Sequence, residues 1–461
     1  MTASTALRSS RPRIRPIGIL FAAGFLVVAS YGAMWISGRA MPHGTPSTAN
    51  RDEAFIPAAI DDGAAGPADL AAIDAQIAVW GPKAAADARD DISAGNLGIL
   101  FLGRGRLTGD AADYEKALAA ADRAVAANPT STGTRALKAT VLQATHDFTG
   151  ALALAEAIVA EEPRNVDALA VVGDAQLELG RLDAAAATYA TIAPIQNGPA
   201  LEAREARLAW LRGDATKALS LATAARDDAA RDGSSDPSFY EAQLGEMARL
   251  TGDAATARTA FDAALAIRPS NQLALMGSAR LAAASGDDAA AIATLRKAAA
   301  IAPRPETLAL LTDLLARDGD AKGAAAQTAT IRAIEQLGGT SARLFDRQLL
   351  AFELDHGGAS QAVLAKARAA AAIRPDAAGL DVVAWAAYRL GDEKTARTFS
   401  DRALATGTAD GRILLHAGAI AIARGDAAAG RALVERALAL GPALDPLDHA
   451  LAQTLLGPMK G

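Results

Sequence analysis

Residues 238–269 read SFYEAQLGEMARLTGDAATARTAFDAALAIRP. The pair Gly252-Asp253 divides this stretch into two segments with helical spacing of apolar residues. Glycine at such a turn adopts a left-handed backbone and ends the first helix, and the aspartate after it caps the second. Pro269 ends the second helix because proline cannot continue it. The stretch therefore predicts one helix–turn–helix unit.

The same turn recurs along the chain. It is found at Gly213-Asp214, Gly252-Asp253, Gly286-Asp287, Gly319-Asp320, Gly391-Asp392 and Gly425-Asp426. Neighbouring pairs lie 33 to 39 residues apart, and one gap spans two units. This is the period of a helical-hairpin array. Alignment on the turn gives ten units, which begin near Gly98, Thr132, Val166, Pro199, Ser238, Gln272, Pro305, Leu344, Ala377 and Gly411.

Small residues and prolines keep fixed places in these units. The eighth residue is glycine or alanine in nine of the ten units, which allows neighbouring helices to approach closely. Position 32 is proline in six units, at Pro129, Pro163, Pro269, Pro303, Pro375 and Pro442. The high alanine content raises chance agreement at the small positions, but it does not place six prolines at one position.

This pattern resembles the tetratricopeptide repeat (TPR) family. In the unit from Ser238 the matching residues are Leu244, Gly245, Ala257, Phe261, Ala264 and Pro269. The resemblance covers roughly residues 85–445 and implies an all-α, TPR-type α-solenoid, a superhelix of about ten helical hairpins. The family's aromatic residue at position four is missing. The units at Pro199 and Pro305 carry longer connections near 231–237 and 338–341, where kinks in the superhelix are expected.

Composition excludes several functions. Alanine makes up about a quarter of the chain and aromatic residues 4%, as in helices that pack closely. There is no cysteine, which removes thiol catalysis and zinc–thiolate sites, and no two of the five histidines have metal-ligand spacing. No phosphate loop, nucleophile elbow or HExxH motif occurs, so we expect no catalytic residues, cofactor or metal. The net charge is −6, and five arginines among the first 40 residues leave −11 on the rest, which argues against nucleic acid as a partner.

The N-terminus carries a membrane signal. Residues 1–16 are basic, and residues 17–36 form a run of 20 without a charge. Twenty helical residues span about 30 Å, the thickness of a hydrocarbon core. We therefore expect a single transmembrane signal-anchor at 17–37 in the inner (cytoplasmic) membrane, with 1–16 cytoplasmic and the repeats periplasmic or extracellular. The alternative is cleavage near residues 28–30, which would make the protein secreted.

Three further segments complete the predicted organisation. Residues 38–68 are rich in Pro, Gly, Ser and Thr and predict a flexible linker. Residues 69–97 are expected to form linker or capping helices, residues 98–445 the repeat array, and residues 446–461 a C-terminal capping helix and tail.

In the TPR family the first helix of each unit lines a concave groove, at its second, fifth, ninth, twelfth and thirteenth residues. The resemblance implies the following partner-binding groove: Arg207, Trp210, Arg249, Arg280, Arg317, Phe352, Trp385, Tyr388 and Arg389. Arginines and large aromatic residues are common binding hot spots. The alternative is that the aromatic residues pack between helices and that the arginines form structural ion pairs.

The resemblance implies a scaffold that binds a protein or peptide, and the N-terminal segment predicts that it is tethered to the membrane on the extracytoplasmic side. It would resemble TPR proteins of envelope assembly, secretion or cytochrome maturation, and nothing in the sequence selects among these roles. The expectation is that it is not an enzyme. Two alternatives stay open: an enzyme with an unrecognised active site in the groove, and a structural protein that self-assembles into a homo-oligomer.

Overall fold

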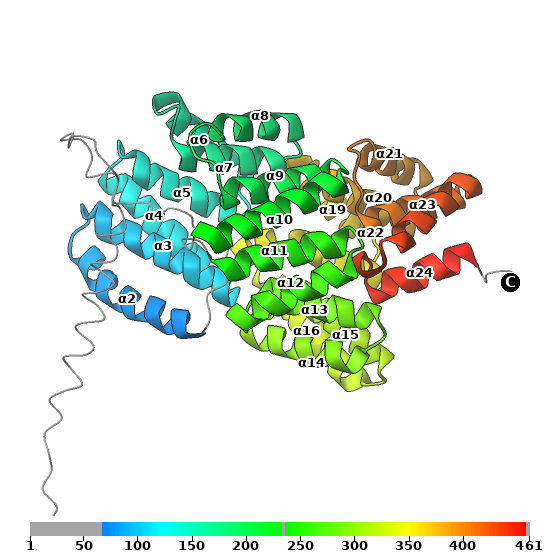
Figure 1. The fold of residues 1–461 in the computed structure, drawn as a ribbon. Helices are drawn as coiled ribbons and strands as arrows, with labels where there is room; N and C mark the ends of the chain where they lie inside the picture. The colour runs from blue at the N-terminus through cyan, green and yellow to red at the C-terminus, as the bar shows by residue number, and fades with distance from the viewer. Residues whose placement is uncertain (1–66, 233–235, 458–461) are drawn as a thin grey trace, which may run out of the picture. The chain divides into compact units, whose positions relative to one another are not determined.

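The computed structural model describes residues 67–232 and 236–457 (Figure 1). The chain divides into two units, Met1–Arg51 and Asp52–Gly461, and every described residue belongs to the second. The described residues form α-helices joined by turns, without a β-strand. No helix in these ranges is long and apolar enough to cross a membrane. The basic segment 1–16, the expected anchor at 17–37 and nearly all of the expected linker 38–68 lie outside the described residues.

Twenty of the helices form ten antiparallel hairpins, as the sequence predicts. In chain order, the pairs are α3 (Asp91–Thr108) and α4 (Ala111–Ala127), α5 (Thr132–Ala144) and α6 (Phe148–Glu161), α7 (Val166–Glu178) and α8 (Leu182–Ile192), α9 (Pro199–Leu211) and α10 (Ala215–Asp232), α11 (Pro237–Leu250) and α12 (Ala254–Ile267), α13 (Gln272–Ala284) and α14 (Asp288–Ile301), α15 (Pro305–Arg317) and α16 (Ala321–Leu337), α18 (Asp346–Asp355) and α19 (Gln361–Ile373), α20 (Ala377–Arg389) and α21 (Glu393–Leu404), and α22 (Gly411–Ala423) and α23 (Ala427–Ala439).

Four further elements of the described ranges lie outside the hairpins. They are α2 (Pro67–Ala86), the short α17 (Gly339–Leu344), the 3-10 turn η2 (Gly441–Ala443) and α24 (Pro446–Leu456). The helix α17 occupies one of the two long connections that the sequence marks. Its Leu344 is buried in the apolar cluster that α3, α4 and α5 form near the start of the array.

The Gly-Asp turns have the backbone that the sequence predicts. All six glycines have φ between 75° and 90°, the left-handed region. In five of the six pairs the aspartate side chain accepts a hydrogen bond from the backbone N–H three residues later, as Asp253 does from Thr256 at 3.0 Å. Asp426 makes no such bond. His146 replaces the glycine in one unit and also has a positive φ, of 60°.

Glycines at the packing positions make room for aromatic side chains. Phe261 on α12 is fully buried between α11 and α13. A Cβ added to Gly245 or Gly277 would run into its ring. Tyr189 on α8 uses the space at Gly173 in the same way. Small residues on the first helices therefore set the distance between hairpins, which is the role that the repeat pattern assigns to them.

Segments about 195 residues apart lie against one another. Arg304 donates to the carbonyl of Arg106 at 3.1 Å, 198 residues away, and Arg249 donates to the carbonyl of Pro442 at 2.7 Å, 193 residues away. Because a TPR unit has about 34 residues, this offset is about six units. One superhelical turn therefore holds about six hairpins, and the later hairpins rest on the earlier ones.

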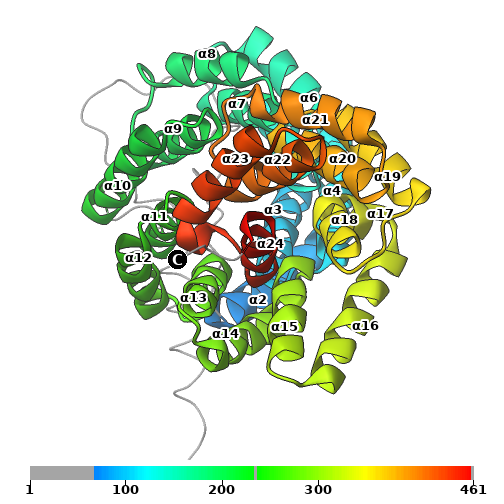
Figure 2. The same ribbon diagram turned by 90° about the vertical axis from the view of Figure 1, so that its right-hand side faces the viewer.

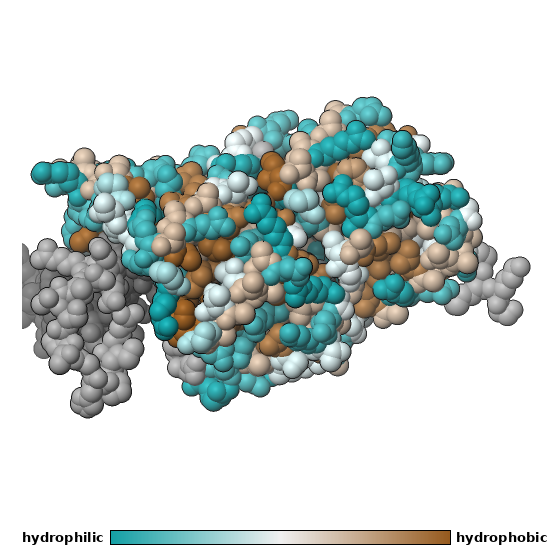
Figure 3. Space-filling view, turned by 90° about the horizontal axis from the view of Figure 1, so that it is seen from above, coloured by the Kyte–Doolittle hydropathy of each residue, from teal (hydrophilic) through white to brown (hydrophobic). Residues whose placement is uncertain are grey.

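The C-terminal helix lies inside the ring of helices when the repeats are viewed end-on. Figure 2 shows α24 near the centre, surrounded by first helices of the hairpins. It packs against α22 and α23 of the last hairpin and also touches α15, while η2 touches α11 and α13. On the face shown in Figure 3, apolar patches are broken up by hydrophilic side chains.

Candidate functional site

The inner side of the superhelix encloses a cavity of about 690 Å³. The first helices of six consecutive hairpins contribute to its wall, from α3 to α13. Arg304, Arg347, Gln348 and Arg374 complete the wall from the next superhelical turn. The cavity therefore exists only because two turns of the superhelix lie against each other.

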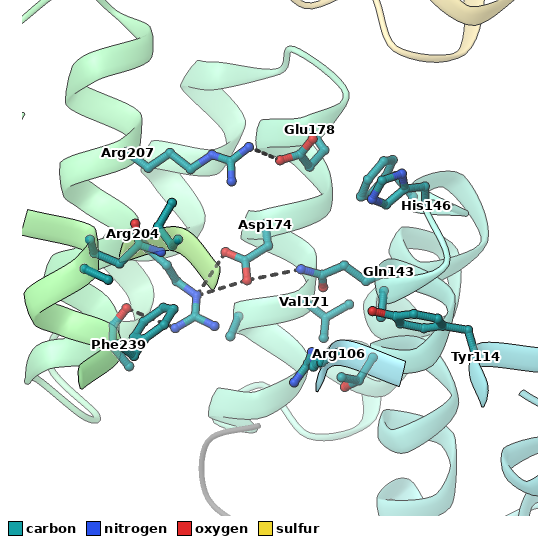
Figure 4. A pocket seen from close by; sticks show the side chains of 18 of the residues that line it. Arg106, Tyr114, Gln143, His146, Val171, Asp174, Glu178, Arg204, Arg207 and Phe239 are labelled. Carbon is teal, nitrogen blue, oxygen red and sulfur yellow. Dashed lines mark hydrogen bonds and ion pairs between the residues drawn. The ribbon is translucent and has the colours of Figure 1, made fainter. Parts of the chain in front are cut away.

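The wall of the cavity is polar and carries more cations than anions. Its charged residues are the arginines Arg106, Arg204, Arg207, Arg304, Arg347 and Arg374 and the carboxylates Asp167, Asp174 and Glu178. Figure 4 shows side chains from neighbouring helices converging on this space. In a chain whose body is acidic, this is a local positive region.

Asp174 on α7 joins three neighbouring helices. It accepts hydrogen bonds from Arg204 on α9 at 2.9 Å and from Gln143 on α5 at 3.3 Å (Figure 4). It also accepts one from Tyr189 on α8 at 2.7 Å. Burial and the Asp174 carboxylate raise the pKa of the Tyr189 hydroxyl above its usual range. Tyr189 therefore stays a neutral donor that fixes the orientation of Asp174.

Glu178, one helical turn further along α7, joins the two superhelical turns. It pairs with Arg207 on α9 and with Arg374, which follows α19 and lies 2.5 Å away. Burial acts to raise the pKa of Glu178, but Arg207 and Arg374 outweigh it and hold the pKa below its ordinary value. A single carboxylate thus serves two arginines in the described structure.

Arg374 is held by several neighbours. Its guanidinium lies over the ring of Phe148, 4.7 Å from the centroid. Burial and the nearby Arg347 lower the pKa of Arg374. Arg347 in turn forms a bidentate pair with Asp376, with N–O distances of 2.6 and 2.9 Å. These contacts fix the part of the wall that belongs to the second turn.

Two amides in the wall keep unused hydrogen-bonding atoms. Gln272 is 6% exposed, and its Nε2 has no hydrogen-bond partner among the described residues. Oε1 of Gln348 is also buried without a partner in the described part of the chain. Because an unpaired buried amide costs free energy, such atoms mark positions where a ligand would gain hydrogen bonds.

The structure places the predicted groove residues at different sites. Of the nine, Arg207 lines the cavity, and 58% of its side chain is exposed there. Arg249 and Arg280 also lie on the inner side, but they contact the C-terminal segment of the same chain. Arg280 donates to Asp445 at 3.0 Å, and Arg249 is 3% exposed.

The other six predicted residues lie away from the cavity. Arg317 on α15 pairs with Asp288 at the start of α14 in the preceding hairpin, and Arg389 donates to the carbonyl of Leu354 at 2.6 Å. The four aromatic residues are packed to different degrees. Phe352 is buried against Leu308 and Ile331, and Trp385 is buried and stacks on His416 and Tyr388. Trp210 and Tyr388 are partly buried beside apolar clusters.

Sequence reasoning missed most of the cavity wall. Arg204 and Gln243 occupy the sixth position of their units, which is not among the five positions used for the prediction. Arg347 and Arg374 belong to the next superhelical turn, and the repeat period alone does not say which unit lies above which. The available signals in the sequence were the longer connections near 231–237 and 338–341 and the arginines Arg368 and Arg374.

The described residues hold no group of three or more His, Asp or Glu side chains that could bind a metal ion. The family profile described as "Tetratricopeptide repeat" matches residues 137–201 and 248–304. The chain contains tetratricopeptide repeats. TPR proteins mediate interactions with other proteins, so a cavity built from the first helices of TPR units is the natural candidate site.

Among solved structures, this TPR protein is similar to PilW, a widely conserved type IV pilus biogenesis factor, with 17% identity, coverage of 46% of this chain and 96% of PilW, and a TM-score of 0.38. It is also similar to a TPR protein from Parabacteroides merdae, with 16% identity, coverage of 52% and 93%, and a TM-score of 0.37. YrrB, a TPR protein with an unusual peptide-binding site, gives 15% identity, coverage of 39% and 91%, and a TM-score of 0.27. No curated protein matches this chain.

Proposed function

We propose that this TPR protein is a scaffold that binds a segment of another protein in the cavity between its two superhelical turns. The observation that supports this most strongly is the wall itself. It combines an excess of arginines with the unpaired amide atoms of Gln272 and Gln348, groups that suit carboxylates and main-chain amides. The positive wall within an acidic chain favours an acidic segment of the partner.

The proposal extends to the cellular location. Residues 17–37 act as a single-pass anchor in the cytoplasmic membrane, and the repeats lie on the extracytoplasmic side. The arginines before the apolar run and the length of that run support this orientation. A reporter fused after Gly461 that is active in the cytoplasm would contradict it, and a mature N-terminus at Tyr31 would replace the anchor with a cleaved signal.

Partner binding is tested with tagged full-length protein recovered from detergent-solubilised membranes. The variant Arg207→Ala removes an exposed guanidinium from the cavity while Glu178 keeps Arg374. The control Arg258→Ala changes an exposed arginine on the outer helix α12. We expect mass spectrometry to find a protein that wild type and Arg258→Ala retain and Arg207→Ala loses. Equal recovery by all three would place binding outside the cavity.

A further inference from the structure

The C-terminal segment of the chain occupies the inner surface beside the cavity. Pro442 and Asp445 face α11 and α13, which are first helices of hairpins in the preceding superhelical turn. Arg249 donates to the main-chain carbonyl of Pro442 at 2.7 Å, and Arg280 donates to the carboxylate of Asp445 at 3.0 Å. Arg249 thus binds a backbone group and Arg280 binds an acidic side chain, which are the two kinds of group that a bound peptide would offer.

The contacts that hold this segment to the first turn are polar. The buried apolar residues Leu444 and Ala452 belong to the cluster of the last hairpin, with Leu415 and Val434. No apolar cluster among the described residues joins α24 to α11 or α13. The segment is therefore attached firmly to the second turn and touches the α11 and α13 surface through hydrogen bonds and ion pairs.

Asp445 and Arg249 each have another partner if the contact opens. Asp445 is the N-cap residue of α24, yet its side chain makes no capping bond, because it points to Arg280. On separation the carboxylate becomes free to cap its own helix. Arg249 already holds Glu246 in a bidentate pair at 2.7 and 2.8 Å, and it keeps that pair without Pro442. Of these three side chains, Arg280 is the one that needs a new partner on opening, and the charges of Glu246 and Glu306 act on it.

We infer that residues 441–445 are an intramolecular ligand, a releasable latch that covers Arg249 and Arg280 until an acidic segment competes for them. The inference rests on the proposed function in one respect, namely that a partner protein supplies such a segment to the inner surface of the superhelix. The latch itself is tested without any partner. Its short connection to α23 gives it an effective concentration on the order of millimolar, so an external competitor binds weakly while the latch is intact.

The test uses the full chain, which has no cysteine. Spin labels are placed at Gln453→Cys on α24 and Lys297→Cys on α14, both exposed, and distances are measured by double electron–electron resonance. Asp445→Ala removes the acidic side chain of the latch, and Asp401→Ala, at an exposed ion pair on α21, is the matched control. We expect a longer or broader distance distribution for Asp445→Ala alone.

The deciding probe is a fluorescent synthetic peptide with the sequence of residues 440–449. We expect it to bind the Asp445→Ala chain at least tenfold more tightly than wild type, and to lose this binding when Arg280→Ala is added. Melting curves by circular dichroism establish that each variant is folded. If the peptide does not bind Asp445→Ala, or binds equally well after Arg280→Ala, the latch is refuted, whereas a failure of the cavity to bind a partner leaves these results unchanged.

Discussion

Gly213 lies where the first superhelical turn meets the second. It has φ 79°, and a Cβ at this position would clash with the carbonyl oxygen of Gly407. Gly391 occupies the same place in its own unit, with φ 75°, and its Cβ would meet nothing within 4 Å. The two glycines differ mainly in the contact between turns.

We predict that Gly213→Ala destabilises the protein more than Gly391→Ala. Alanine in the left-handed region costs about 1 kcal/mol at either position. At Gly213 the clash adds about 1–3 kcal/mol, because the backbone of the facing turn has to shift. Urea unfolding followed by circular dichroism compares the two variants. Equal losses would mean that the turns do not touch at this point.

Arg249 and Arg207 were predicted as equivalent groove arginines, but Arg249 is buried and Arg207 is exposed, so we expect their replacement to affect stability differently. Arg249→Ala leaves the partly buried Glu246 without its bidentate partner, which costs about 3 kcal/mol. Arg207→Ala leaves Glu178 with Arg374 and changes the free energy of unfolding by about 0.5 kcal/mol or less. Similar melting temperatures for both variants would contradict this difference.

At the scale of residues, the local turn was predictable and the site was not. The sequence of each Gly-Asp pair contains all that its turn requires, because the left-handed glycine and the capping aspartate are neighbours. Arg249 shows the opposite case. Its helix and its inward direction follow from the repeat, but its partner Pro442 lies 193 residues away. The role of Arg249 in binding stays a prediction.

At the scale of helices, the spacing of hairpins depends on an aromatic ring set into glycines. Gly277→Ala on α13 puts a methyl group against the ring of Phe261, and we predict a loss of about 1–3 kcal/mol by overpacking. Adding Phe261→Leu should recover part of that loss, because the smaller side chain vacates the contact. Gly81→Ala in α2, where a Cβ meets nothing within 4 Å, should be neutral or stabilising by up to about 1 kcal/mol. A Gly277→Ala variant as stable as wild type would refute this packing role.

The repeat pattern predicts one set of contacts of the C-terminal helix α24 and gives no sign of the other. A polar-faced helix after the last unit is expected to cover its apolar face, and α24 does pack on α22 and α23. Its second set of contacts, through Asp445 to α13, has no signal in the repeat. Proline and aspartate at a helix start look the same whether the aspartate caps the helix or binds an arginine elsewhere.

At the scale of the molecule, Glu178 makes stability depend on pH. Its pKa in the folded chain is below the ordinary value of 4.5. A carboxylate of this kind stabilises the fold above its unfolded pKa, and the contribution is lost as pH falls through the folded pKa. We predict that Glu178→Gln lowers the free energy of unfolding at pH 7 and that its difference from wild type shrinks below about pH 4.5. Glu115→Gln, exposed on α4, is the control; a pH-independent loss for Glu178→Gln would contradict the ionic role.

The period of the repeats predicted ten hairpins in one array, and the structure confirms that architecture. The number of units in one superhelical turn was not predictable, because it depends on small rotations between hairpins that add up over six units. The number of hairpins in one turn places Arg374 next to Glu178, and it brings together the two turns that form the cavity. The fold thus follows from local pattern, whereas the candidate site follows from the pitch.

Photo-crosslinking from inside the cavity tests most directly whether a partner protein binds there. A photoreactive amino acid replaces Gln243, which lines the cavity on α11, or Thr259, which is exposed on the outer helix α12. The full-length protein is irradiated in membranes, and adducts are identified by mass spectrometry. We predict a protein adduct at position 243 that is absent at 259 and is lost with Arg207→Ala. The same adducts at both positions, or an adduct at 259 alone, would contradict it.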